Sequence, residues 1–436
     1  MFDEALIQLR DEMTRSLCTN LRIQSDAQPP EEGKPNGAGV ARALEHALRT
    51  ASQMGFATKD VDGQAGWVEY GEGAEMIAVL GHLDVVPAGD GWIHPPYAGI
   101  IEDGRIYGRG AVDDKGPMFA ALYGLKAIKD RGLPLSKRIR LIFGTSEETT
   151  CADMAYYVTK EELPVAGFTP DAGFPVIYAE KGILHVTFSR DFPDLEDADI
   201  TLERLKGGNA VNMVADKAEA VLKVGGSQVR LESLGSSAHG SRPQWGKNAC
   251  FALLELLSHQ DLPLTMQDAF SFLTYALTQE TAGQNLGLAA ADEASGTLTV
   301  NLGLLEGGST YIRGSLDIRY PVTVSKDQIL SRLEDSFSKG GFSIDSFSHK
   351  PPLYVPEENP LVQTLTAVFR EKTGLPNGPI ATGGGTYART MPNILAFGPQ
   401  FPEDQDLCHQ PNEYIAIDRL ILLSQIYARA MYELAK

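Results

Sequence analysis

The most constraining feature of this chain is a pair of short apolar runs, each followed directly by a glycine and then by ionisable residues. Met76–Leu80 and Ile139–Phe143 are mostly apolar and have the length of buried strands. Between them, Pro117–Arg131 has a proline at a helix start, helical spacing of apolar residues, and Gly132 just past its end. This order predicts an α/β fold with a mostly parallel central sheet flanked by helices. Such sheets bind ligands beyond the carboxyl ends of their strands.

The rest of the chain divides into an outer part of this style and a middle part of another. The closing stretch, with a strand at 394–397 and a long helix at 418–434, returns to the strand-then-helix order. From about 181 to 350, short strand-like segments alternate with helices, which is typical of an inserted α+β unit. We therefore expect residues 1–180 and 351–436 to form one domain and residues 181–350 a second domain inserted into it.

Charge and composition argue against several classes of partner and location. The chain carries 57 acidic and 38 basic residues, a net charge of −19, and such a surface repels nucleic acid and anionic membranes. Its four cysteines lie far apart with no CxxC pair, which argues for free thiols in a reducing compartment. The start lacks the pattern of a signal peptide, and no stretch reaches about 18 apolar residues. We expect a cytoplasmic protein with no nucleic-acid or membrane partner.

The first candidate site residues directly follow a predicted strand or precede the predicted helix. His82 and Asp84 stand two apart after Met76–Leu80, so in extended backbone they point the same way. A carboxylate on the second ring nitrogen would fix the tautomer of a metal-binding imidazole. Asp113 and Asp114 precede the helix, and in extended backbone only one of them can point inward. Each feature alone also fits an ordinary loop, since acids suit a helix N-terminus.

The other candidates lie in later loops. Glu147 and Glu148 follow the Ile139–Phe143 strand, where adjacent carboxylates repel unless a cation, a proton or water relieves them. Asp171 stands in a turn and His409 in a loop before the last helix, and each alone is an ordinary polar residue. Together, two imidazoles and three carboxylates form a donor set that suits zinc, manganese or cobalt. In hydrolytic metal sites one glutamate can bind the ion while its neighbour takes a proton from water.

In their order along the chain, these motifs resemble those of the metallopeptidase superfamily of aminoacylase and carboxypeptidase G. The motifs are Gly81-His82-Leu83-Asp84, Gly108-Arg109-Gly110 with Asp113-Asp114-Lys115-Gly116, Glu147-Glu148, Pro170-Asp171-Ala172 and the late His409. Further motifs narrow the resemblance to the PepV-like (Sapep-type) dipeptidases: Gly173-Phe174-Pro175-Val176, Glu180-Lys181-Gly182, Val211-Asn212-Met213-Val214, Ser237-Ala238-His239-Gly240, Asp317-Ile318-Arg319-Tyr320-Pro321 and Gly383-Gly384-Gly385-Thr386-Tyr387-Ala388-Arg389. The resemblance runs nearly end to end. It implies a zinc-exopeptidase-like catalytic domain, with residues 181–350 as its lid.

The resemblance implies two divalent metal ions, zinc or else manganese or cobalt. Their ligands would be His82, Asp113 and Asp171 for one ion and Asp113, Glu148 and His409 for the other. Asp113 rather than Asp114 would be the bridging ligand, because the family ligand stands two places before the motif lysine, here Lys115. The implied activity is hydrolysis of the amide bond of a dipeptide.

The resemblance also implies the catalytic residues. Glu147 would be the general base that takes a proton from metal-activated water, and Asp84 would orient His82. His239 would stabilise the oxyanion, which needs a donor in a dry cleft. Outside the family context, a histidine in this position would be interpreted as a polar surface residue.

Substrate binding is assigned to the lid and one glycine-rich loop by the same resemblance. Asn212, Arg319, Gly384, Gly385 and Thr386 would bind the terminal carboxylate of a small peptide, for which arginine has a suitable two-pronged geometry. Two lid motifs, at 214–216 and 239–242, depart from relatives that often have proline and other small residues, and this leaves the substrate preference open. In PepV-like enzymes a doubled lid mimics a dimer interface, so we expect a monomer.

Two other functions stay open. An N-acyl amino-acid deacylase or desuccinylase of the same superfamily would use the same metals on substrates without a free α-amine. A non-catalytic binding protein would keep the same fold. Against this alternative, the chain retains every residue of the proposed metal set and Glu147. A phosphate-binding enzyme is disfavoured, because Gly383–Thr386 lacks the lysine of a P-loop.

Overall fold

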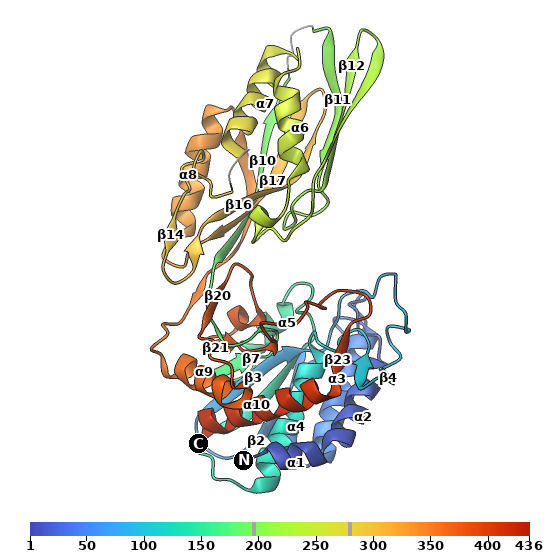
Figure 1. Ribbon diagram of the computed structural model, residues 1–436, viewed down its shortest axis with the longest axis vertical. Helices are drawn as coiled ribbons and strands as arrows, with labels where there is room; N and C mark the ends of the chain where they lie inside the picture. Colours follow the sequence, from blue (N-terminus) through green and yellow to red (C-terminus); the bar gives the residue numbers. More distant parts are fainter. Residues whose placement is uncertain (194–197, 278–280) are drawn as a thin grey trace. The chain divides into compact units, whose positions relative to one another are not determined.

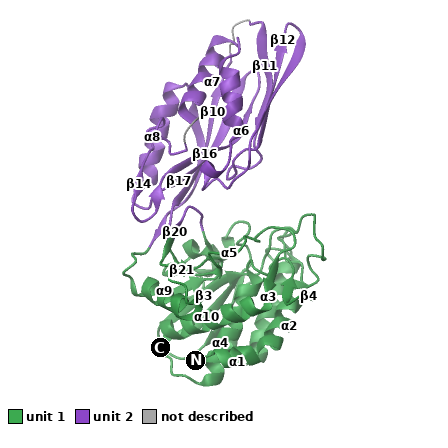
Figure 2. Cartoon of the chain, viewed as in Figure 1, with its two compact units in different colours: residues 1–178, 355–380, 386–436 green, residues 179–354, 381–385 purple. Residues whose placement is uncertain are grey.

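The structure is a computed structural model that describes residues 1–193, 198–277 and 281–436 (Figure 1). The chain divides into two compact units (Figure 2). Unit 1 comprises residues 1–178, 355–380 and 386–436, and unit 2 comprises residues 179–354 and 381–385. Unit 1 is therefore assembled from both ends of the chain.

Unit 1 is built on a mixed sheet whose central strands are parallel. Its strand order is β1 (Ala57–Val61), β2 (Ala65–Tyr70), β6 (Arg138–Gly144), β3 (Met76–His82), β7 (Ala166–Thr169), β21 (Ile394–Ala396) and β9 (Ile177–Glu180). The short strands β19 (Leu353–Tyr354) and β20 (Ile380–Thr382) pair with β9. The neighbours β6, β3, β7 and β21 run parallel, whereas β1, β2 and β9 are antiparallel to their neighbours. Every residue of β3 is buried, as expected for a central strand covered on both faces.

Helices cover both faces of this sheet (Figure 1). They are α1 (Asp3–Gln8), α2 (Arg10–Leu21), α3 (Ala38–Gln53), α4 (Lys115–Arg131), α5 (Ala152–Tyr157), α9 (Pro360–Thr373), the 3₁₀ turn η2 (Tyr387–Thr390) and α10 (Ile417–Ala435). The first helical segment is divided in two, because Leu9 separates α1 from α2. Gly132 ends α4 in the left-handed conformation, φ 58°, as its position in the sequence predicts.

Glycines show which helix lies on which face. A Cβ on Gly66 would meet Leu44 and Leu48 of α3, and one on Gly81 would meet Met118 of α4. On the opposite face, Gly144 lies against Asp153 of α5 and Tyr387 of η2. Gly124 lets α4 approach the backbone of α10 at Ser424 and Ala428. Small residues at the sheet and at the helix crossing thus bring α4, α5 and η2 close to the strand ends.

Two small sheets flank the carboxyl end of the central sheet. One joins β4 (Ile100–Glu102), β5 (Arg105–Tyr107) and β23 (Tyr414–Ala416), and the other pairs β8 (Ala172–Gly173) with β22 (Pro399–Gln400). Through them the segment before α4 lies beside the segment before α10, although about three hundred residues separate them in sequence.

Unit 2 is a seven-stranded antiparallel sheet covered by helices. Its strand order is β13 (Ser227–Leu234), β12 (Lys217–Val224), β11 (Ile200–Gly207), β16 (Thr299–Gly307), β17 (Tyr311–Tyr320), β10 (Gly182–Asp191) and β18 (Ser343–Lys350). The helices α6 (Ala249–Ser258), α7 (Leu264–Leu277) and α8 (Lys326–Lys339) contribute to one apolar core with the strands. The remaining elements are η1 (Pro243–Trp245), β14 (Ala291–Asp292) and β15 (Gly296–Thr297). The predicted fold class, an α/β domain plus an α+β domain, is confirmed.

No helix among the described residues is long and apolar enough to cross a bilayer.

Candidate metal centre

The five predicted metal ligands come from five separate segments of unit 1. His82 is the last residue of β3, Glu148 follows β6, and Asp171 follows β7. Asp113 lies between β5 and α4, and His409 lies between β22 and β23. The three strands involved are neighbours in the sheet, so their carboxyl ends bring these loops together.

The ligand atoms form two groups that share Asp113. His82, Asp113 and Asp171 form one group and Asp113, Glu148 and His409 the other, with the atoms of each group within 4.8 Å of one another. His82 Nε2 lies 3.1 Å from Asp113 Oδ1 and 3.8 Å from Asp171 Oδ1. His409 Nε2 lies 3.1 Å from Asp113 Oδ2 and 3.2 Å from Glu148 Oε2. The two oxygens of Asp113 therefore face different imidazoles.

This donor set fits divalent metal ions. Imidazole nitrogens and carboxylate oxygens attract each other only when a proton or a cation lies between them. Ligand atoms around a tetrahedral zinc ion, with bonds of about 2.0–2.1 Å, stand roughly 3.3 Å apart. The four contacts of 3.1 to 3.8 Å match that spacing.

Asp84, two residues further along the chain, orients the ring of His82. Its Nδ1 donates a hydrogen bond to the backbone carbonyl of Asp84 at 3.0 Å, while the Asp84 carboxylate lies 3.4 Å away. This fixes Nδ1 as the protonated nitrogen and directs Nε2 to the metal centre. The Asp84 carboxylate itself accepts the backbone N–H groups of Glu147 and Glu148, at 3.3 and 3.1 Å. Asp84 thus ties the end of β3 to the glutamate loop.

Charges within the cluster shift the pKa values of its members. Burial alone would lower the pKa of His82, but hydrogen bonds with Asp113, Asp171 and Asp84 raise it well above its ordinary value. Hydrogen bonds with Asp113 and Glu148 raise the pKa of His409 to about 10. Burial opposes ionisation of Asp113, yet hydrogen bonds from His409 and His82 hold its pKa well below the usual range. The cluster therefore favours positive charge at its centre.

Glu147 lies beside the two groups without belonging to either. Among the described residues its carboxylate has no hydrogen-bond partner, and burial followed by the charges of Asp171, Glu148 and Asp113 raises its pKa to about 8. Burial likewise raises the pKa of Asp171 to about 6. A carboxyl group that prefers its proton near neutral pH suits proton transfer.

Both adjacent acids point inward, because the backbone is not extended at this point. Asp114 is fully buried, and its Oδ2 accepts the backbone N–H of His82 at 3.1 Å. The expectation of a single inward acid applied to extended backbone, whereas Asp114 has φ −126° and ψ 8° and directly precedes α4. Asp113 faces the imidazoles, and Asp114 holds the end of β3 from the side of α4.

The glutamate loop is supported by a pair that sequence reasoning missed. Oδ2 of the buried Asp153 accepts the N–H groups of Thr145 and Ser146 and the hydroxyl of Tyr387. The Tyr387 ring also packs edge-on against His82, with centroids 6.1 Å apart. Tyr387 stands in the motif that follows the three glycines, but no sequence signal connects it with Asp153.

A second missed pair joins the loops of Asp113 and His409. Glu413 is fully buried, and its carboxylate accepts the N–H groups of Gly110, Val112 and Asp113. It also binds Arg109 at 2.8 Å, and Arg109 donates further hydrogen bonds to the carbonyls of Ala88, His409 and Gln410. Arg109 belongs to a motif named above, but its pairing with Glu413 depends on the contact between β5 and β23. This ion pair fixes the Asp113 loop relative to His409, a residue about three hundred positions away.

The predicted substrate residues of unit 2 are also close to one another. The backbone carbonyl of Asn212 accepts the N–H of Gly240, which follows His239, and Met213 forms a β-bridge with His239. Arg319 is bound by both oxygens of Asp317 and donates to the carbonyl of Gly383. Asn212, His239 and Arg319 thus lie around the turn that precedes Gly384.

The glycine loop itself divides between the units. Gly384 and Gly385 belong to unit 2, whereas Thr386 belongs to unit 1, where its hydroxyl accepts the N–H of Ala388 at the start of η2. Gly384 donates its N–H to the hydroxyl of Thr382. The loop is therefore held at both ends by threonine side chains.

With this geometry in place, comparison with known proteins identifies the family. The model of peptidase family M20/M25/M40 matches residues 78–433. The chain belongs to this peptidase family. The resemblance noted from the motifs is thereby confirmed, and the peptidase family match covers all five candidate ligands.

Two relatives named putative dipeptidases align with the chain along its whole length. It is 39% identical to "Putative dipeptidase YtjP" of Bacillus subtilis, over 99% of both chains. It is 34% identical to "Putative dipeptidase SAB1611c" of Staphylococcus aureus, over 100% of this chain and 99% of the relative.

Solved structures of the M20 type share the fold. Human carnosine dipeptidase 1 matches with a TM-score of 0.59 and 18% identity, covering 99% of this chain and 98% of that one. The YxeP protein of Bacillus subtilis, described as a dinuclear metal binding peptidase from the M20 family, matches with a TM-score of 0.54 and 12% identity, covering 100% and 98%. At these identities the likeness is one of fold.

Substitution of Glu413 tests whether the buried ion pair positions the metal ligands. Glu413→Gln keeps the size of the side chain but removes acceptors from the Asp113 loop and leaves Arg109 without its counter-charge. We expect metal affinity to fall about 10- to 100-fold, measured by competition with a chromophoric chelator. The control is Glu403→Gln, a half-exposed glutamate in the same segment that pairs with Arg419. Unchanged metal affinity in Glu413→Gln would show that the pair is not required for positioning.

The raised carboxyl pKa values predict how pH affects the chelator-treated protein. Glu147 and Asp171 titrate in the folded chain at about 8 and about 6, above their ordinary values of 4.5 and 3.8. Their protonated forms therefore stabilise the fold at low pH, and this contribution is lost as pH rises through the folded values. The raised pKa values of His82 and His409 act in the same direction.

We therefore expect the melting temperature of the chelated protein to fall from about pH 5 to about pH 9. Zinc or manganese needs the deprotonated ligands, so the increase in melting temperature on adding metal should be larger at the higher pH. Thermal melts over this range measure both quantities. A metal-induced increase that is equal at both ends of the range would contradict the cluster electrostatics.

Proposed function

We propose that this chain is a cytoplasmic, monomeric dipeptidase that hydrolyses the amide bond of dipeptides with two divalent metal ions, zinc in the first place and otherwise manganese or cobalt. The observation that carries the proposal is the arrangement of Asp113, whose two oxygens face His82 and His409. Membership of the peptidase family and the dipeptidase names of the full-length relatives support the reaction class.

His82, Asp113 and Asp171 would hold one ion, and Asp113, Glu148 and His409 the other. When bound, the two ions would make a water molecule more acidic and polarise the scissile carbonyl. Asp84 keeps His82 in the tautomer that leaves Nε2 free for an ion, through the hydrogen bond at Nδ1. Each ion is assigned to one of the two groups whose donor atoms lie within 4.8 Å of one another.

Glu147 is the proposed general base. Its partly buried carboxylate lies beside the proposed ligands and has no hydrogen-bond partner within the part of the chain that the structure describes, and its N–H is held by Asp84. A group with a pKa raised towards neutrality can accept a proton from water and then deliver it to the leaving amine. Because cations at the centre would offset the charges of Asp171 and Asp113, they would lower this pKa and leave the base ready to accept a proton.

His239 is the proposed donor to the oxyanion. The N–H of Ser241 points to its Nδ1, so Nδ1 is the acceptor and Nε2 carries the proton of the neutral ring. Burial and then the charge of Arg319 lower the pKa of His239, which favours this neutral form. A neutral Nε2–H can donate a hydrogen bond to a developing negative charge.

The proposed site for the substrate's terminal carboxylate comprises Asn212, Arg319 and the loop Gly384, Gly385 and Thr386. Asp317 holds Arg319 through Nε and Nη2, and this fixes the plane of the guanidinium while offsetting part of its charge. Backbone N–H groups of the glycine loop can supply the remaining donors. Closure of the lid over a short substrate would exclude longer chains.

Paired substitutions of the adjacent glutamates test the mechanism. Glu147→Gln should retain two metal ions per chain and lower kcat by roughly 10²- to 10⁴-fold, because it removes proton transfer alone. Glu148→Gln is the matched control at the neighbouring position, and it should lose metal affinity. Turnover on dipeptides and metal content after gel filtration measure both. Near-normal turnover by Glu147→Gln would refute the base assignment.

The substrate class is tested with the wild-type enzyme on dipeptides and on acetylated and succinylated amino acids. A dipeptidase should prefer substrates with a free α-amine. Preference for the acylated amino acids would identify a deacylase instead, and no turnover of any substrate after adding zinc or manganese would favour a binding protein.

A further inference from the structure

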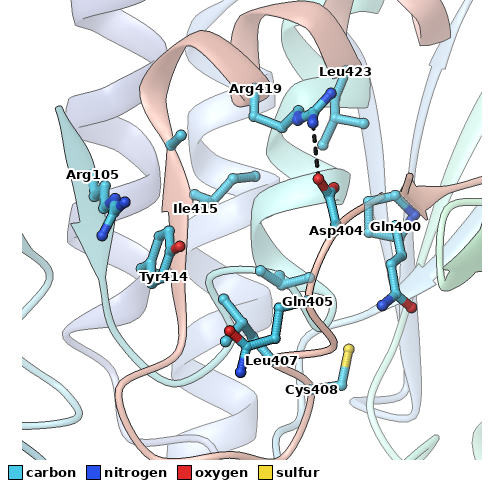
Figure 3. Close-up of a pocket in the computed structure, with 13 residues that line it drawn as sticks. Arg105, Gln400, Asp404, Gln405, Leu407, Cys408, Tyr414, Ile415, Arg419 and Leu423 are labelled. Carbon is cyan, nitrogen blue, oxygen red and sulfur yellow. Dashed lines mark hydrogen bonds and ion pairs between the residues drawn. The ribbon is translucent and has the colours of Figure 1, made fainter. Parts of the chain in front are cut away.

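A cavity of unit 1 adjoins the candidate metal centre without containing any of its ligands (Figure 3). Its volume is about 250 Å³. Val112 and Cys408 line it, and they directly precede Asp113 and His409. The cavity is therefore connected to the cluster by the backbone of these two neighbours.

The walls of the cavity are mainly apolar. Its apolar lining comes from Val112, Pro399, Leu407, Ile415, Ala416 and Leu423. The polar groups Gln400, Gln405 and Tyr414 stand beside them, on β22, the segment after it, and β23. A cavity of this size and character suits a small ligand with an apolar body and few polar groups.

The cavity also holds two guanidinium groups with different partners. Arg419 of α10 is paired with Asp404 at 2.8 Å (Figure 3). Glu403, outside the cavity lining, lies 3.4 Å from the same guanidinium. Arg105 of β5 is exposed and lies 4.4 Å above the ring of Tyr414, and no carboxylate of a described residue lies within 4 Å of it. Tyr107 also interacts with this guanidinium, so the two tyrosines hold it while other N–H groups face the cavity opening. A stacked arginine that is not ion-paired with a carboxylate is suited to binding one.

We propose that this cavity binds a small carboxylic acid with an apolar body, whose carboxylate pairs with Arg105. Apolar amino acids belong to this class, and their identification as the physiological ligand rests on the proposed function, because a dipeptidase releases them at every turnover. Simple aliphatic carboxylates share the same chemistry and are separated from amino acids by the experiment below.

Occupancy of the cavity would act on the metal centre through one segment. Residues 401–413, which contain His409 and part of the cavity wall, form only turns and irregular structure. His409 and Asn412 both have φ of 64°, a conformation that such residues rarely adopt. A ligand between this segment and the β5–β23 pair would hold it in place, so ligand and metal should each strengthen the binding of the other.

The test is calorimetric titration of the metal-loaded Glu147→Gln protein, whose turnover is expected to be strongly reduced. The probes are L-leucine, 4-methylpentanoate, which lacks the amine, and leucinamide, which lacks the carboxylate. We expect leucine to bind, and leucinamide to bind at least tenfold more weakly. Binding of 4-methylpentanoate but not of leucine would keep the carboxylate site and overturn the amino acids as its ligand.

Arg105→Glu, added to the Glu147→Gln protein, separates this cavity from the substrate site. Reversal of an exposed charge should weaken leucine binding roughly tenfold. The control is Arg49→Glu, at an exposed arginine of α3 that pairs with Glu45. Leucine should also slow the transfer of metal to a chelator in the Glu147→Gln protein that retains Arg105. It should have no such effect once Arg105→Glu is added. Equal leucine affinity in Arg105→Glu and Arg49→Glu would overturn the proposal.

The two proposals fail in different ways. If the wild-type chain hydrolyses no dipeptide but Arg105-dependent leucine binding persists, the proposed function fails and the cavity remains a carboxylate site. If dipeptides are hydrolysed but leucine binding does not depend on Arg105, the cavity proposal fails alone.

Discussion

The carboxylate of Asp113 lies between two imidazoles, and the rest of unit 1 depends on holding it there. One oxygen faces His82 and the other faces His409, each at 3.1 Å. The three carboxylates of the cluster repel one another unless positive charge lies between them. The raised pKa values of His82 and His409 and the lowered pKa of Asp113 indicate that the cluster favours such positive charge. A pair of divalent cations satisfies all five donors at once. This requirement explains why buried residues around the cluster donate and accept so many hydrogen bonds to backbone.

Three carboxylates that bind no ion in our proposal build the frame of the site. Asp84 joins β3 to the glutamate loop, Asp153 holds that loop to η2, and Glu413 joins the loops of Asp113 and His409. Each accepts two or more hydrogen bonds, at least one of them from a donor remote in sequence. These bonds hold loops that regular secondary structure does not hold. Supporting contacts of this kind typically affect metal affinity almost as much as the ligands do. Val112 and Cys408, which line the cavity, directly precede Asp113 and His409. A ligand in the cavity would therefore affect metal binding at the cluster.

Sequence patterns were sufficient for the features that depend on local periodicity or on an ordered set of motifs. The apolar runs at β3 and β6, the helix α4 with its terminal Gly132, and the ionisable residues beyond each strand all follow from composition and spacing. The features that were missed depend on backbone geometry between distant segments. The inward position of Asp114, the Arg109–Glu413 pair and the Tyr387–Asp153 contact need the sheet to be assembled before the residues can meet. The spacing of apolar residues near the N-terminus does not indicate that Leu9 separates two helices.

Counting the metal ions bound by ligand variants tests the central claim most directly. In protein loaded with zinc and passed over a desalting column, the wild type should keep two ions per chain. Asp171→Asn removes a ligand from one group only and should keep one ion, whereas Asp113→Ala removes a ligand from both groups and should keep neither at wild-type affinity. A full-affinity ion retained by Asp113→Ala would contradict a bridging role for this carboxylate, and with it the shared centre on which the account is built.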